Sequence, residues 1–198
     1  MNYYHKALRR EAWLPSRGLL RQLAWGVVVV LASVFLLYPL LHELGHALAA
    51  GLFGGRVVRI TVYPAFYTEC AIRSDQMGCY IATAMAGVLF PLLLSAAVSL
   101  RGERGFLLTL SMRVMSLGYA AGEVFGVSRC ILGSLRETSD LSVLIYETGA
   151  DPYATLVLAG FLLILSVLLL VIIEPVSWFA AVSDRVAEGQ RAARCAPR

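Results

Sequence analysis

Apolar residues gather in long uninterrupted runs along this chain, with polar residues confined to the segments between them. Runs without a charged residue cover residues 23–41, 78–100 and 153–173. A helix needs about 20 mostly apolar residues to cross the hydrocarbon core of a bilayer. A fourth run is interrupted by Arg113, Glu123 and Arg129. We therefore predict an all-α membrane protein with about four transmembrane helices, over residues 23–51, 78–100, 106–132 and 153–174.

The segment after the first run has a different pattern. Residues 56–72 are dominated by β-branched and aromatic residues and are interrupted by Pro64, which is typical of a β-hairpin. At membrane depth such backbone persists only when it is buried in protein or lines a water-filled cavity. A short hairpin packed beside the first span and a hairpin in an external loop both satisfy this pattern. Residues 133–152 are polar and include a short possible helix that ends at Thr148.

Composition agrees with a membrane protein. The chain is 59% hydrophobic and 15% charged, with a mean hydropathy of +0.72, whereas soluble domains have about 45–50% apolar and about 25% charged residues. No long polar stretch remains for a soluble domain. We predict a basic interfacial segment over residues 1–22, one membrane domain over residues 23–175, and a polar basic tail over residues 176–198. The first run is too long for a signal peptide, so we expect it to be retained.

The placement of positive charge predicts the orientation of the spans. The net charge is +4. Eleven basic residues flank the spans on the side that holds both termini: Lys6, Arg9, Arg10, Arg17, Arg21, Arg101, Arg104, Arg185, Arg191, Arg194 and Arg198. The opposite side has only Arg56, Arg59, Arg73 and Arg136. Because positive charge marks the cytoplasmic side, both termini are predicted to be cytoplasmic. Topology and anionic lipid account for these charges, so we predict no nucleic-acid partner.

The four cysteines form no CxxC pair. Cys70 and Cys79 fall on the predicted non-cytoplasmic side, where a disulfide is permitted. Free buried thiols are the other interpretation of this pair.

Two of the three histidines lie one helical turn apart at the end of the first apolar run, as His42-Glu43-Leu44-Gly45-His46. This spacing places both imidazoles on one helix face, where they can bind one Zn²⁺. Glu43 would act as the general base toward water activated by the metal, as in zinc proteases. The alternative is a set of packed polar residues at a helix end. Pro39, three residues earlier, is expected to loosen the helix.

A catalytic zinc usually has three protein ligands and one open position. On the predicted topology, Asp140 can reach the histidines, and Glu123 is an alternative third ligand. Asp140 has another possible role as a helix N-cap, and Glu123 as an ion-pair partner of Arg113 or Arg129. Weaker candidates are Glu69, Asp75, Glu137 and Glu147.

The stretch from His42 to Ala50, followed by Gly54-Gly55-Arg56-Val57, resembles the site-2 protease family of intramembrane zinc metalloproteases. The resemblance implies that His42 and His46 bind zinc with a later aspartate, and that Glu43 is the general base. Ala86-Gly87 with Pro91 is similar to the small-residue helix of the family. The chain departs from the family in lacking an Asn-Pro element and in having Leu141 rather than Gly after Asp140.

These features predict an integral-membrane zinc metalloprotease that hydrolyses peptide bonds in or near the bilayer. Its expected partners are a membrane-spanning or membrane-associated protein substrate and the lipid bilayer. An alternative is a non-catalytic zinc-binding membrane scaffold or chaperone of the same fold. A metal transporter is less well supported, because few ionisable residues are distributed over several spans.

Overall fold

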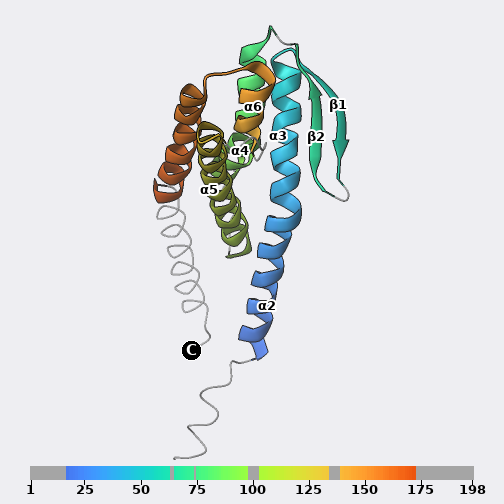
Figure 1. Cartoon of the computed structure of the whole chain (residues 1–198). Coiled ribbons are helices and arrows are strands. Elements are labelled where there is room, and N and C mark those ends of the chain that lie inside the picture. The colour runs from blue at the N-terminus through green and yellow to red at the C-terminus, as the bar shows by residue number, and fades with distance from the viewer. Residues whose placement is uncertain (1–16, 63–64, 74, 98–102, 134–138, 173–198) are drawn as a thin grey trace, which may run out of the picture.

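A computed structural model describes residues 17–62, 65–73, 75–97, 103–133 and 139–172 and is mostly helical (Figure 1). The predicted C-terminal tail, residues 176–198, and residues 1–16 of the N-terminal segment lie outside the described residues. In chain order the elements are α2 (Arg17–Ala32), η1 (Ser33–Leu37), α3 (Tyr38–Leu52), β1 (Arg56–Thr61), β2 (Tyr67–Ala71), α4 (Met77–Ala97), α5 (Glu103–Ile131), α6 (Asp140–Thr148) and a last helix, Pro152–Ile172.

Among the described residues, three helices are long and apolar enough to cross a membrane: Leu23–Leu52, Met77–Ala97 and Pro152–Ile172. The predicted third span forms α5, a single helix of 29 residues that carries more charge. Arg113 and Glu123 of α5 are each only 3% exposed, so these charges face the protein interior. Charged groups within membrane helices generally take this inward position. The predicted fold class, a helical membrane protein with a short hairpin after the first helix, is confirmed.

The first span is one continuous helix that contains a wider turn. α2 and α3 are joined by η1, a π-helical segment, where the N–H of Tyr38 bonds to the carbonyl of Ser33. Pro39 follows directly and has no N–H to continue the α-helical pattern. The Ser33 hydroxyl, fully buried, donates to the Val29 carbonyl at 2.8 Å. Pro39 thus loosens the helix as predicted, and the loosening takes the form of a π turn.

The helices pack around a core of mostly small and branched residues. α4 lies against α3 at very short range, because a Cβ atom added to Gly45 would collide with the Ala86 carbonyl oxygen. The core on the other face of α4 consists of Ala84, Val88, Ala120, Val127, Leu141, Leu144, Ala159 and Leu162. Small side chains at helix contacts let backbones approach closely in membrane proteins.

The hairpin folds back along α3 rather than extending away from it (Figure 1). β1 and β2 are antiparallel, from the pair Arg56–Ala71 to the pair Thr61–Tyr67. The Thr68 hydroxyl donates to the backbone carbonyl of Glu43 at 3.1 Å, which ties β2 to α3. Of the two placements left open by the sequence, the structure therefore has the hairpin beside the first span.

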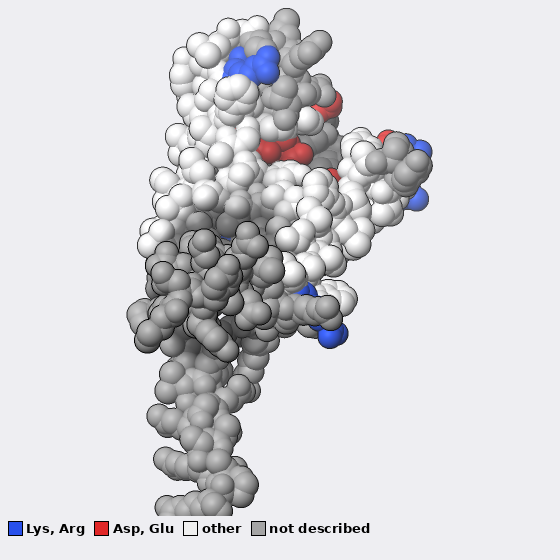
Figure 2. Space-filling view, turned by 90° about the horizontal axis from the view of Figure 1, so that it is seen from below, with Lys and Arg blue, Asp and Glu red and all other residues white. Residues whose placement is uncertain are grey.

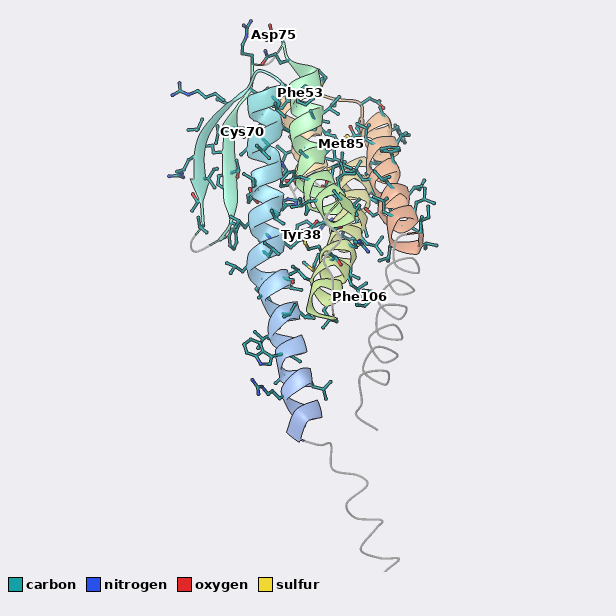
Figure 3. All side chains as sticks on the ribbon, turned by 180° about the vertical axis from the view of Figure 1, so that it is seen from behind. Tyr38, Phe53, Cys70, Asp75, Met85 and Phe106 are labelled. Carbon is teal, nitrogen blue, oxygen red and sulfur yellow. The ribbon has the colours of Figure 1, made fainter. Side chains whose placement is uncertain are left out.

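Cys70 on β2 and Cys79 on α4 are free thiols, so the structure has the unpaired form of the two alternatives. Cys79 is buried, whereas Cys70 is half-buried on the hairpin (Figure 3). Burial, with smaller contributions from Cys79 and Glu43, raises the pKa of the Cys70 thiol. The Cys70 thiol is therefore held in its protonated, less reactive form.

Among the described residues seen from below, most of the surface is uncharged (Figure 2). The long first helix and the last helix expose many large apolar side chains, among them Val27, Phe35, Val157, Phe161 and Val171. Such faces are unfavourable in water and suit contact with lipid.

Candidate metal centre

The two motif histidines lie on the face of α3 that meets α4. Both are buried, and their Nε2 atoms are 3.2 Å apart. The Nδ1 atom of His46 is 2.7 Å from the backbone carbonyl oxygen of Thr83, which can only accept a hydrogen bond. The proton of a neutral His46 ring therefore lies on Nδ1, and Nε2 is left with a lone pair for a metal. A hydrogen bond of this kind orients metal-binding histidines in many proteins.

Asp140, the first residue of α6, completes a cluster with the histidines. Its Oδ2 atom is 3.1 Å from Nε2 of His42 and 3.2 Å from Nε2 of His46. The N-cap of α6 is Ser139, whose hydroxyl accepts from the N–H of Ser142. The alternative role of Asp140 as N-cap is therefore wrong, and its carboxylate is free to face the histidines.

The spacing of the three donor atoms fits a zinc ion. Four donors at 2.0–2.1 Å from a tetrahedral zinc are about 3.3 Å from one another. The three observed separations are 3.1, 3.2 and 3.2 Å. Two imidazole nitrogens and one carboxylate also match the donor types of catalytic zinc sites with an open fourth position. His42, His46 and Asp140 are thus the residues of the described chain that could hold the metal.

A glycine of α4, Gly87, leaves space for the imidazoles of His42 and His46. A Cβ atom on Gly87 would lie 2.5 Å from Nε2 of His46 and 2.6 Å from Cε1 of His42. Any other residue at this position would therefore push the imidazoles away. The resemblance included Gly87 in a small-residue helix, but the contact with the histidines appears only in the folded structure.

The three side chains of the cluster differ in their exposure. The side chains of His42 and His46 are 7% and 10% exposed, whereas that of Asp140 is 35% exposed. Burial acts to raise the pKa of the Asp140 carboxyl, but the hydrogen bonds and charges of the two imidazoles outweigh it and hold that pKa well below its usual range. The imidazoles therefore favour the ionised form of Asp140, which is the most accessible of the three side chains.

Glu43 lies beside the cluster but is not one of its three members. Its carboxylate interacts electrostatically with His46, and its backbone is held by Thr68 of the hairpin. A carboxylate that lies beside a metal site without binding the metal can serve as a general base.

The structure does not bring Glu123, the alternative third ligand, into the cluster of the described residues. Its carboxylate oxygens instead accept hydrogen bonds from the backbone N–H groups of Asp140 and Leu141, at 3.1 and 2.8 Å. Among the weaker candidates, Glu69 pairs with Arg59 and Asp75 with Arg73, both on the exposed surface. Glu147 is exposed on α6, and Glu137 lies outside the described residues.

Two tyrosines form an aromatic wall beside His42 that the sequence analysis did not identify. The ring of Tyr119, on α5, is 4.8 Å from the His42 ring and 5.0 Å from the Tyr38 ring. Tyr38 is fully buried midway along the long first helix (Figure 3). Tyr38 lies one turn before His42, which was a usable signal, but the partner from α5 could not be found from spacing.

A family model described as Peptidase M50B-like matches residues 18–121, which is just over half of the chain. The match covers the long first helix, the hairpin, α4 and most of α5. No curated protein and no solved structure matches the chain. Glu123 and Asp140 lie beyond the matched residues.

Proposed function

The chain belongs to the Peptidase M50B-like family, and on that basis we propose that it is an integral-membrane zinc endopeptidase that hydrolyses peptide bonds in or near the bilayer. The resemblance to the site-2 proteases, expected from the first motif, is confirmed at the level of the family. The proposal assigns His42, His46 and Asp140 as the zinc ligands and Glu43 as the catalytic base.

The observation that carries this proposal is the convergence of three donor atoms from two distant segments. His42 and His46 come from α3, and Asp140 begins α6 almost 100 residues later, yet all three donor atoms lie within 4.8 Å of one another. Buried polar groups in a membrane protein are costly to maintain and generally mark functional sites. A group of this composition and spacing is suited to holding a metal with one open position.

Glu43 would carry the proton in the hydrolysis. A zinc ion in this site supplies Lewis acidity, which polarises the scissile carbonyl and makes water more acidic. Glu43 takes a proton from the attacking water molecule while the oxygen atom of that water bonds to the carbonyl carbon. When the C–N bond breaks, Glu43 passes this proton to the departing amine. Water is thereby divided between the new carboxyl and amino ends.

The proposed substrates are membrane-spanning or membrane-associated proteins. Two of the three candidate ligands, His42 and His46, lie within the helix Leu23–Leu52, which is apolar enough to cross a bilayer. The hairpin beside it presents apolar residues on its exposed face, including Val58, Ile60 and Val62. A segment that reaches the site from the bilayer would therefore meet apolar surface. The distribution of positive charge supports placing both termini in the cytoplasm.

Substitution of the base separates catalysis from metal binding. We expect purified Glu43→Gln to retain one zinc per chain and to lose cleavage by about 10²–10⁴-fold, because only the proton carrier is removed. The assay uses the full chain in detergent with zinc chloride. Single-span membrane peptides and unfolded casein serve as probes, with products identified by mass spectrometry.

Asp140→Ala provides the comparison, because it should lose both zinc and cleavage. Cleavage by Glu43→Gln at the wild-type rate would contradict the proposed mechanism. A wild-type chain that binds zinc but cleaves none of the probes would favour the non-catalytic scaffold or chaperone instead.

A further inference from the structure

Glu123 is a buried carboxylate on α5 that faces the beginning of α6. It is 3% exposed. Its Oε1 atom accepts from the N–H of Asp140 at 3.1 Å, and its Oε2 atom accepts from the N–H of Leu141 at 2.8 Å. Both oxygens of a buried carboxylate are therefore bonded to the backbone of the segment that carries Asp140.

The N–H groups in the first turn of α6 are bound partly by a local cap and partly by Glu123. The first N–H groups of a helix have no acceptor within the helix. In α6 the N–H of Ser142 bonds to the Ser139 hydroxyl at 3.3 Å, in a local capping box. The two preceding N–H groups, those of Asp140 and Leu141, bond to Glu123. The cap within the loop thus fixes α6 internally, and Glu123 fixes it to another helix.

The contact between Glu123 and the beginning of α6 also leaves the Asp140 side chain available to the histidines. The beginning of a helix carries a partial positive charge, which attracts a nearby carboxylate. Glu123 supplies that carboxylate from α5. The Asp140 Oδ2 atom is then 3.1 Å and 3.2 Å from the two histidines, instead of being bound to the beginning of its own helix.

We propose that Glu123 is the positioning residue of the metal centre, which clamps the beginning of α6 to α5 so that Asp140 is presented to His42 and His46. This inference rests on the proposed zinc site. The outer hydrogen bonds of ligating carboxylates affect metal affinity, typically by 10–100-fold when they are removed. Glu123 therefore acts through the backbone of a ligand and does not contact the metal.

The test compares Glu123→Ala and Glu123→Gln with the wild-type full chain in detergent. Zinc affinity is measured by competition with a chromogenic chelator, and amide hydrogen exchange is measured in the metal-free protein. We expect Glu123→Ala to bind zinc about 10–100-fold more weakly and to exchange faster in peptides covering Asp140–Thr148. Exchange in α3 should be unchanged. Glu123→Gln keeps one acceptor oxygen, so its zinc affinity should lie between those of the wild type and Glu123→Ala.

Glu147→Gln is the matched control, because Glu147 is an exposed acidic residue on α6, the helix that Glu123 contacts, and the variant should behave as wild type. Wild-type zinc affinity in Glu123→Ala would overturn the proposal. Faster exchange throughout the chain would overturn it too, since it would indicate a general structural role. If Glu123→Ala does not fold, Glu123→Gln decides by the same two measurements.

The exchange measurement needs no zinc, so it distinguishes the two hypotheses. A wild-type chain without zinc affinity would contradict the proposed function. Unchanged exchange at the beginning of α6 in the variants would contradict the clamp itself, whether or not zinc binds.

Discussion

At the scale of single residues, the candidate metal centre depends on a missing side chain as much as on the ligands. Gly87 faces the imidazoles of His42 and His46 at a distance that no Cβ atom can occupy. Real Cβ atoms essentially never approach other heavy atoms to 2.5 or 2.6 Å, so the imidazoles or the backbone of α4 would have to move. Both histidines are buried, which leaves little room for such a movement.

Gly87→Ala is therefore expected to displace the histidines and weaken zinc binding by about 10-fold or more, with an overpacking cost of about 1–3 kcal/mol. Zinc titration and thermal unfolding in detergent measure the two effects. Gly78→Ala, on the same helix in open space, is the control and should bind zinc like the wild type. Equal zinc affinity in both variants would show that the histidines tolerate the methyl group.

The residues differ in how far their roles were predictable from sequence. The spacing of polar residues on one helix, which is a local property, predicted His42, Glu43 and His46 as site residues. Asp140 was one of several carboxylates that the predicted topology placed on the same side as the histidines, and the fold brings it to them. Glu123 was considered as a ligand because it lies in the outer half of the third predicted span. Its hydrogen bonds to backbone groups 17 and 18 residues away have no sequence signature.

At the scale of elements, hydrophobic length predicted the helices and composition predicted the hairpin. The π-helical form of η1 was not predicted, although Pro39 marked its position. The third predicted span became α5, where buried Arg113 and Glu123 reduce its apolar character. Hydropathy alone could not show that these charges point inward, because that depends on contacts with neighbouring helices. Arg113, for example, donates to the Ser95 carbonyl of α4 at 2.8 Å.

The short helix α6 should be sensitive to its N-cap. Ser139→Ala removes the hydroxyl that accepts from Ser142, which costs about 1 kcal/mol in typical helices. The measurement is equilibrium unfolding in detergent. Ser128→Ala on α5 is the control, because that hydroxyl only bonds back to the Val124 carbonyl within its own helix. A stability loss in Ser139→Ala no larger than in Ser128→Ala would contradict the importance of this cap.

At the scale of the whole molecule, the long first helix and the last helix present apolar surfaces, and the described residues seen from below include few charges (Figure 2). The proposed orientation places the N-terminus, the α4–α5 connection and the C-terminus in the cytoplasm. The candidate metal centre then lies in the outer half of the protein, since α3 follows α2 toward the opposite side (Figure 1). This orientation rests on the distribution of positive charge.

Labelling of the native Cys195 in the C-terminal tail measures that orientation. In a variant without the other three cysteines, we expect a membrane-impermeant maleimide to label Cys195 only after the cells are permeabilised, because the proposed orientation places the tail in the cytoplasm. For comparison, Glu147→Cys in a cysteine-free background should be labelled in intact cells, since Glu147 is exposed near the opposite end. Labelling of Cys195 in intact cells would invert the proposed topology.

The unequal exposure of the three proposed ligands has a consequence for inhibitor design. The histidine rings are almost covered, and α4 approaches them without an intervening side chain, whereas Asp140 is open on one side. A chelating inhibitor would have to approach along the Asp140 side, so its variable groups would contact α6 rather than α4. Selectivity should therefore come from α6, which lies outside the part of the chain that matches the family.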